Sequence, residues 1–213
     1  NFQINSYYSN HNFIDYCFRI IKVTHVNKFR YDTAYTGKFS KDSVEIRRQT
    51  FTLDEYRAFT SAMIAYVAKK NTKHLTKDQI FERQLNRHYF LFIGNCGLRS
   101  GEARQLHWHN IETFKDKTKR GTVGTFAKIT VEAMTTKVRE GRTVYCRNGE
   151  IIDRWRKLCK EHGRKIEGNV FSIDGSEYNR TNPYRNFQRI IEIADIDTER
   201  KKLLVPYSLR HFF

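Results

Sequence analysis

The sequence predicts an α+β domain that is mainly α-helical and contains one small antiparallel β-sheet. Two helix-start signals, Thr52-Leu53-Asp54-Glu55 and Thr76-Lys77-Asp78-Gln79, each precede apolar residues at helical spacing. One stretch, residues 122–147, is instead rich in β-branched and aromatic residues, which favour strands. Helical patterns resume at residues 151–162 and 182–194.

The first two helices are predicted from their caps. The Thr52 hydroxyl can accept from the backbone N–H of Glu55 while the Glu55 carboxylate accepts from that of Thr52, and Thr76 repeats this pattern with Gln79. We expect each helix to bury one apolar face. The residues of these faces are Tyr56, Phe59, Met63 and Val67 in the first helix, and Phe81, Leu85, Tyr89, Phe92 and Ile93 in the second.

Gly97 predicts the end of the second helix, because glycine readily adopts the left-handed backbone conformation that closes helices. Arg99 would then follow directly after a rigid helix end. Ser100 is expected to cap a third helix that runs through Leu106.

The strand-forming stretch predicts a hairpin. Its apolar and β-branched residues are Val123, Phe126, Ile129 and Val131, followed by Thr143, Val144 and Tyr145. The Glu140-Gly141 pair marks the tight turn, which would place Lys137 on the hairpin. Of the last two helices, the first should close at Gly163, and the second should have Asn182 as its cap and Pro183 in its first position.

The charge of the chain indicates a polyanionic partner. Its 39 Lys and Arg residues outnumber 23 Asp and Glu residues, which gives a net charge of +16. Such a surface suits DNA phosphates, although a basic surface alone also fits RNA, an anionic membrane surface or a merely soluble basic protein. The sequence contains no run of eighteen apolar residues and no signal-peptide pattern, so we expect a cytoplasmic protein.

The cysteines and histidines do not follow metal-binding spacing. The four cysteines lie in apolar or aromatic surroundings and are expected to be reduced and buried; they are Cys17, Cys96, Cys146 and Cys159. His107 and His109 flank a tryptophan, but no further ligand follows at a recognisable spacing. We therefore expect a structural or DNA-facing role for the two histidines, and no bound metal.

Two motifs place an arginine in an apolar setting of turn and helix. The first is Gly97-Leu98-Arg99-Ser100-Gly101-Glu102, and the second is Tyr207-Ser208-Leu209-Arg210-His211. Thr135-Thr136-Lys137, followed by Arg142, lies between them. Two arginines and a lysine that converge would suit a phosphate, because guanidinium groups donate paired hydrogen bonds in a fixed fork.

Each of these residues also has a purely structural interpretation. Arg99 can be a surface charge or a partner of Glu102, and Arg210 can simply begin an amphipathic helix. For Lys137, a slip in hairpin alignment would put Lys128 or Arg139 in its place.

The motifs resemble those of the tyrosine recombinases, also called the phage integrase family. The first motif, followed by Leu106 and Trp108, is similar to the first arginine box of that family, and the second motif is similar to its His-x-Leu-Arg-His box. The segment with Lys137 resembles the lysine-bearing β-hairpin. The resemblance extends from about Arg47 to Phe213.

The resemblance implies a fold, an activity and a set of roles. The fold is the recombinase catalytic fold, and the activity is site-specific DNA strand cleavage and rejoining through a 3′-phosphotyrosine, with no metal, ATP or other cofactor. Arg99 and Arg210 would stabilise transition-state charge, Lys137 would protonate the leaving 5′ oxygen, and Glu102 would orient its neighbours. The implied partner is duplex DNA, bound by a homotetramer, which places the protein on the nucleoid.

Two departures from the family pattern concern tyrosines. Tyr207 stands where the family usually has histidine, and a phenol can donate a hydrogen bond but is a poor proton shuttle. The family nucleophile follows the second box by several tens of residues. It is therefore expected beyond Phe213, and the 213-residue chain should not cleave DNA alone.

These expectations divide the chain into two parts. Residues 1–45 would be the end of a preceding DNA-binding domain and a linker, and residues 46–213 would be the catalytic domain without its nucleophile. Two alternatives are a non-catalytic DNA-binding relative that acts as a regulator or structural factor, and a helix-turn-helix regulator. The second is weaker, because a recognition helix would not explain a lysine on a hairpin.

Overall fold

A computed structural model describes residues 49–212, except residues 119–120, 136–139 and 148. The expectations for residues 1–45, for Cys17 and for Lys137 therefore lie outside the described residues. The helices are α2 (Leu53–Val67), α3 (Lys77–Cys96), α4 (Ser100–Arg104), α5 (Glu150–Glu161), α6 (Thr181–Ile193), α7 (Thr198–Leu203) and α8 (Ser208–Phe212). The strands are β1 (Ile111–Lys117), β2 (Val123–Val131) and β3 (Arg142–Arg147), and the short 3-10 turns are η2 (Lys69–Asn71), η3 (Trp108–Asn110) and η4 (Ala133–Thr135). The predicted α+β, mainly helical class is confirmed.

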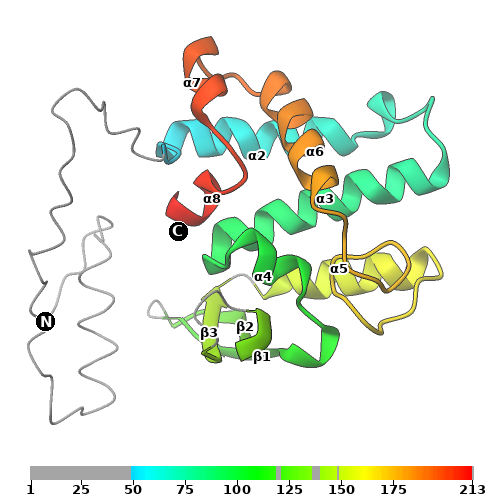
Figure 1. The fold of residues 1–213 in the computed structure, drawn as a ribbon, viewed down its shortest axis with the longest axis vertical. Helices are drawn as coiled ribbons and strands as arrows, with labels where there is room; N and C mark the ends of the chain where they lie inside the picture. Colours follow the sequence, from blue (N-terminus) through cyan, green and yellow to red (C-terminus); the bar gives the residue numbers. More distant parts are fainter. Residues whose placement is uncertain (1–48, 119–120, 136–139, 148, 213) are drawn as a thin grey trace, which may run out of the picture. The chain divides into compact units, whose positions relative to one another are not determined.

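Helix α3 is the central element of the fold. It packs on α2 and α6 on one side, on α5 and β3 on the other, and on α8 near its C-terminal end. Figure 1 shows α3 crossing the molecule below α2 and α6 and above α5. Ten of its residues are buried, including five large aromatic or aliphatic side chains: Phe81, Leu85, Tyr89, Phe90 and Phe92. A helix with half of its residues buried, most of them apolar, belongs in the interior of a domain.

Aromatic packing holds the helices on both sides of α3. Phe59 of α2 and Phe90 of α3 each lie against Phe187 of α6, with ring centroids 5.2 Å and 5.6 Å from that of Phe187. On the opposite side, Phe81 stacks on Trp155 of α5 at 5.2 Å. Each buried aromatic ring contributes on the order of 2 to 3 kcal/mol through burial, so these contacts fix the helix layers.

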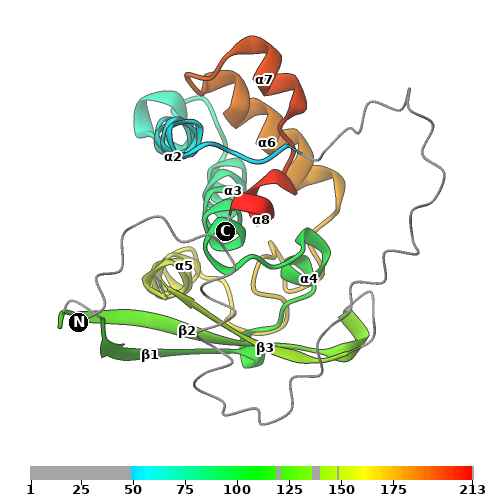
Figure 2. The ribbon, with the colours of Figure 1, turned by 90° about the vertical axis from the view of Figure 1, so that its left-hand side faces the viewer.

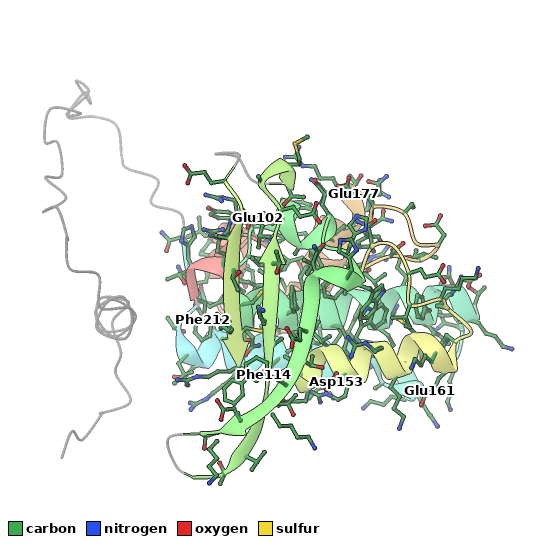
Figure 3. All side chains as sticks on the ribbon, turned by 90° about the horizontal axis from the view of Figure 1, so that it is seen from below. Glu102, Phe114, Asp153, Glu161, Glu177 and Phe212 are labelled. Atoms are coloured by element: carbon green, nitrogen blue, oxygen red, sulfur yellow. The ribbon has the colours of Figure 1, made fainter. Side chains whose placement is uncertain are left out.

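The strands form one antiparallel sheet in the order β1-β2-β3. Ala127, Ile129 and Val131 of β2 face inward and are buried, and α5 packs on β1 and β2. Figure 2 shows the strands nearly edge-on beneath α5, with α3 above it. On the outer face Phe114 and Phe126 stack with centroids 5.8 Å apart (Figure 3).

The sheet corrects two details of the sequence analysis. Strand β1 was not foreseen, because its alternation of apolar and charged residues is weak. The prediction of a tight turn at Glu140-Gly141 is wrong. Val131 pairs with Arg142, so residues 132–141 connect β2 to β3. Gly141 lies directly before β3, where an added Cβ would come within 3.3 Å of the Val131 carbonyl oxygen.

The predicted caps of the first long helices are confirmed. Both capping boxes form, with Thr52 and Glu55 before α2 and Thr76 and Gln79 before α3. Gly97 ends α3 in the left-handed conformation, with φ 63°. Helix α5 ends one residue earlier than predicted, and Gly163, with φ 67°, follows it.

Two predicted caps are wrong. Ser100 is the first residue of α4, with Arg99 as the cap, and the helix ends at Arg104 instead of Leu106. Helix α6 begins at Thr181, so Asn182 and Pro183 lie inside its first turn. Arg180 is the cap, and the side-chain oxygen of the preceding Asn179 accepts from the Thr181 backbone N–H at 2.9 Å. Pro183 is tolerated there, because backbone N–H groups of a first helical turn have no partner within the helix.

Helix α7, which was not predicted, closes the fold over the start of α2. Arg200 donates from Nε and Nη2 to the Glu55 carboxylate at 2.7 Å and 3.0 Å. Arg200 also donates to the side chain of Gln49 and to the Thr50 carbonyl. A two-pronged arginine–carboxylate pair has a defined geometry, so it fixes α7 against the N-terminus of α2.

Gly149, at the junction of sheet and α5, should not tolerate a side chain. An alanine Cβ there would lie 2.5 Å from both the carbonyl carbon and the carbonyl oxygen of Phe126. The Phe126 backbone is held in the sheet and cannot move aside without a cost in energy. Gly149→Ala should therefore lower the free energy of unfolding by at least about 2 kcal/mol in urea denaturation. Gly101→Ala is the control: a Cβ there meets no described atom within 4 Å, and alanine in a helix should add about 0.5 kcal/mol. Equal effects of the two changes would mean that the junction is not tightly packed.

Candidate functional site

Glu102 is the centre of the candidate site. Its side chain is only 1% exposed and lies in α4. It accepts from the backbone N–H of Arg99 at 2.9 Å and from the Nη1 of Arg99 at 2.9 Å. It also accepts from Arg142, and Arg210 lies 3.9 Å from it. Three arginines from separate segments therefore surround one buried carboxylate.

Arg99 is placed by the end of α3. Gly97 terminates the helix, and Leu98, which is fully buried, anchors the turn that follows. The Arg99 carbonyl then accepts from the Ala103 N–H at 2.9 Å, which begins α4. Because Arg99 and Glu102 are three positions apart in this turn, their side chains meet on one face.

Arg142 contributes the best-aligned contact with Glu102. Its Nη1 and Nη2 donate to Oε1 and Oε2 of Glu102 at 3.0 Å and 2.7 Å, a two-pronged arrangement. Arg142 is the first residue of β3, opposite Val131. The pair thus ties the sheet to α4, near which Figure 3 labels Glu102.

Arg210 reaches the same carboxylate from α8. Its Nη1 lies 3.9 Å from Glu102 Oε2, and this buried atom has no hydrogen-bond partner among the described residues. Leu209 is fully buried and Phe212 stacks on Tyr56 of α2 at 4.2 Å, so α8 is held on both sides of Arg210. The Tyr56 ring can pack closely against α3 because Gly94, which faces it, has no side chain.

Tyr207 lies beside Arg210 and His211. Its ring centroid is 6.0 Å from the Arg210 guanidinium carbon and 4.8 Å from the His211 ring centroid. Ser208 forms the turn before α8, because its hydroxyl accepts from the Val205 N–H at 3.1 Å. The second motif therefore folds as one turn that carries both Tyr207 and Arg210 to the site.

The hydrogen bonds keep Glu102 ionised. Burial alone raises the pKa of this carboxyl, but the hydrogen bonds from Arg142 and Arg99 outweigh burial and hold the pKa below its usual value. Three guanidinium groups around one carboxylate leave an excess of two positive charges. The arginine side chains are 35%, 34% and 25% exposed for Arg99, Arg142 and Arg210, so an anion can reach them.

The sequence analysis named most of this cluster but missed Arg142. Arg99, Glu102, Arg210 and Tyr207 come together, whereas Lys137 lies outside the described residues. Arg142 was noted only as following the lysine. Its partner, Glu102, is 40 positions away in the sequence, and no local sequence pattern can predict a contact between residues so far apart. An arginine at a strand start near a turn is the available signal, and it is weak.

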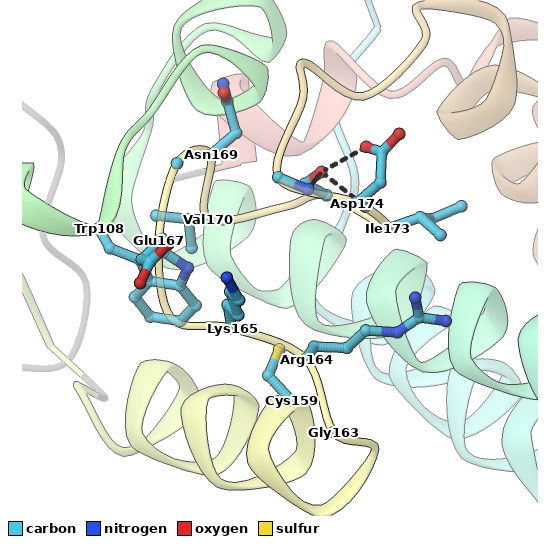
Figure 4. A pocket seen from close by; sticks show the side chains of 13 residues that line it. Trp108, Cys159, Gly163, Arg164, Lys165, Glu167, Asn169, Val170, Ile173 and Asp174 are labelled. Carbon is cyan, nitrogen blue, oxygen red and sulfur yellow. Dashed lines mark hydrogen bonds between the residues drawn. The ribbon is translucent and has the colours of Figure 1, made fainter.

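Other candidate sites do not join this cluster. A cleft of about 540 Å³ lies between the end of α5 and residues 163–175, and Lys165, Glu167 and Asp174 are among the residues that line it (Figure 4). His109 lies 3.3 Å from the Glu132 carboxylate, and the described residues hold no group of three or more metal-ligating side chains. Cys96, Cys146 and Cys159 are buried and unpaired as expected, and burial raises the pKa of Cys146 to about 11.

Two solved structures are similar to this chain. One is the XerH site-specific recombinase bound to a palindromic difH substrate in a post-cleavage complex, with a TM-score of 0.54 and 19% identity, over 78% of this chain and 41% of that one. The other is XerH bound to a difH substrate in a pre-cleavage complex, with a TM-score of 0.53, 20% identity and the same coverage. The fold therefore matches that of the tyrosine recombinases.

The similarity is one of fold. This chain spans less than half the length of either XerH chain. No family model matches the sequence, and no curated protein matches it. Within the described part of the chain, no helix is both long and apolar enough to cross a membrane.

Glu102→Gln should destabilise the fold strongly at neutral pH. The change leaves three partly buried guanidiniums without their counter-charge, which should cost about 2 to 3 kcal/mol of unfolding free energy in urea denaturation. Glu177→Gln is the matched control, because Glu177 is 47% exposed and pairs with one arginine, and its loss should cost less than about 1 kcal/mol.

The deficit of Glu102→Gln should also depend on pH. Because folding lowers the pKa of Glu102, its stabilisation is complete above the unfolded pKa of about 4.3 and is lost as the pH falls through the lower folded value. The difference between wild type and variant should therefore shrink in acid. A difference that stays constant down to pH 2 would contradict this assignment.

Proposed function

We propose that this chain is the catalytic part of a site-specific DNA recombinase, which cleaves and rejoins strands through a 3′-phosphotyrosine. The observation that carries the proposal is the convergence of Arg99 and Arg210, from two separate motifs, on one buried carboxylate. The fold likeness and the net charge of +16 support it. Integration or excision of a mobile element by a homotetramer on the nucleoid is the finer form of this proposal.

The arginines suit the charge that develops at a phosphodiester under attack. A hydroxyl that attacks phosphorus builds negative charge on the two non-bridging oxygens, and preorganised guanidiniums stabilise that charge. The Arg210 side chain is 25% exposed, so its guanidinium can approach one of these oxygens. Among the described contacts, only Nη1 of the Arg99 side chain bonds to Glu102, which leaves its other N–H donors for a phosphate.

Glu102 acts as a positioning residue in this proposal. A general base works best with a pKa near the operating pH, whereas the pKa of Glu102 is lowered and its two oxygens accept hydrogen bonds from both Arg99 and Arg142. Its role is to hold the guanidiniums in place before the substrate arrives. Arg142 shares that role and would link the sheet to any phosphate bound there.

Lys137 is proposed to protonate the leaving 5′ oxygen. It lies five positions before Arg142, so chain geometry keeps it within about 17 Å of that residue. A lysine in the connection between β2 and β3 can approach a scissile phosphate that the arginines hold. Tyr207 would donate a hydrogen bond to the same phosphate, and the nucleophilic tyrosine is proposed to lie beyond Phe213.

A second candidate function is DNA binding without cleavage, as in a regulator or structural factor. Tyr207 in place of the usual histidine favours it, because the site then lacks its ordinary proton shuttle. Covalent capture separates the two functions. A protein that continues past Phe213 and forms no adduct with nicked DNA, although its arginines are intact, would support the non-catalytic alternative.

The 213-residue chain should bind duplex DNA with an affinity that falls steeply as salt rises, because each neutralised phosphate contributes about 0.9 to the slope of log K against log salt. Fluorescence anisotropy measures this slope. The chain alone should form no covalent adduct with a nicked substrate, whereas a protein that continues past Phe213 should form one. An adduct with the 213-residue chain would instead identify an internal tyrosine, such as Tyr207, as the nucleophile.

In the longer protein, Arg99→Ala and Arg210→Ala should abolish cleavage while weakening DNA binding only modestly, since each is one of 39 cationic side chains. Lys137→Ala should also block cleavage of normal DNA. A substrate with a 5′-bridging sulfur should restore cleavage in the lysine variant alone, because a thiolate leaves without protonation. Rescue of all three variants, or of none, would remove Lys137 from the proton-donating role.

A further inference from the structure

A second group of arginines lies where α3 packs on α5. His88 of α3 and Trp155 of α5 are in contact, with ring centroids 5.2 Å apart. The residue before each of them is an arginine, Arg87 and Arg154. Burial lowers the pKa of Arg87, and the positive charge of Arg154 lowers it further. Burial also lowers the pKa of His88, and the charges of both arginines add to that effect. Arg87 and Arg154 therefore both flank the contact between the two helices.

Neither arginine has an acidic partner among the described residues. The Arg87 Nε is buried without a hydrogen-bond partner, and no ion pair of the described residues includes Arg87 or Arg154. Among the described residues, Arg154 donates only to the Glu150 carbonyl oxygen, at 3.3 Å. By contrast, Arg156 of the same helix pairs with Asp153 at 3.0 Å.

This arrangement is unfavourable without an anion. Burial removes water from the Arg87 guanidinium, and the neighbouring Arg154 adds repulsion. His88 does not offset the charge, because burial holds its pKa at about 4 and its ring is neutral near pH 7. The carboxylate of Asp153 is already engaged by Thr113 and Arg156. Within the part of the chain that the structure describes, the two arginines thus form a cationic pair without a counter-charge.

We propose that Arg87 and Arg154 form a second phosphate-binding site, which takes a backbone phosphate of duplex DNA. Two guanidiniums can share the two non-bridging oxygens of one phosphodiester. Arg87 is ten positions before the end of α3 at Gly97, so the second site lies about 15 Å along the helix from the turn that carries Arg99. The choice of DNA as the source of the phosphate rests on the proposed function.

The test compares three variants with a matched control. Arg87→Gln, Arg154→Gln and the double variant each remove charge from the pair. Lys160→Gln removes the same charge from an exposed position of α5 that helical geometry places on the other flank of that helix. Binding of the 213-residue chain to duplex DNA is measured by anisotropy across a series of salt concentrations.

Each single arginine variant should weaken binding and make the slope of log K against log salt shallower by about 1. The double variant should lose no more slope than either single variant, because both arginines contact one phosphate. Lys160→Gln should change the slope less. Absent binding by the wild type would defeat the proposed function itself. Wild-type binding with an unchanged slope in the arginine variants would overturn the second site alone.

Stability measurements identify the ligand. In chloride buffer Arg87→Gln should unfold at the same temperature as wild type or higher, because the change removes an unpaired, partly buried charge. Inorganic phosphate at matched ionic strength should then raise the unfolding temperature of wild type more than that of the variant. Equal shifts would contradict a phosphate site. Stabilisation through Arg87 by polyglutamate but not by phosphate would assign the site to an acidic protein and overturn the proposal.

Discussion

The Glu102 carboxylate is buried and ionised, and arginines from the end of α3, from β3 and from α8 stabilise it there. Burial of an ion costs several kcal/mol, and each hydrogen bond to a charged group returns about 1.5 to 3 kcal/mol. Glu102 accepts four such bonds, two from Arg99 and two from Arg142, and these offset its burial. The orientation of the Arg99 and Arg142 guanidiniums relative to one another therefore depends on a single side chain.

The rest of the fold makes that arrangement rigid. Helix α3 is enclosed by aromatic side chains, so its C-terminal end is a fixed point for Arg99. The stacking of Phe212 on Tyr56 and the burial of Leu209 fix α8, and with it Arg210. Because the guanidiniums are held by the protein before any ligand binds, they need little reorganisation at a phosphate, which is the condition for strong electrostatic stabilisation.

Much of this could be predicted from the sequence, and the limits have physical causes. Local hydrogen-bond patterns form the capping boxes at Thr52 and Thr76 and the helix end at Gly97. Each pattern involves residues that lie within about four positions of one another in the sequence. Short elements were harder to predict. The start of α6 is set by Asn179, and α4 is too short to show a helical period, so its cap was placed one residue late.

The candidate site was predicted in part because its two motifs are themselves local turns. What joins them is tertiary. The pairing of Val131 with Arg142 sets the position of Arg142, and no period in residues 122–147 specifies that register, because the connection before β3 is long. Because of the same register, the chain does not form the tight turn that was expected at Glu140-Gly141. The contact of Arg142 with Glu102 follows only when the sheet is packed beside α4.

A crystal structure of the 213-residue chain grown with tungstate, a phosphate mimic with strong anomalous scattering, would examine the Glu102 cluster itself. We expect an anomalous peak within hydrogen-bond distance of the Arg99 and Arg210 guanidiniums, with Arg142 still bound to both oxygens of Glu102. Crystals of the Glu102→Gln variant should lack that peak. Arginines turned away from an empty site in the wild type, or an equally strong peak in the variant, would show that Glu102 does not assemble an anion site.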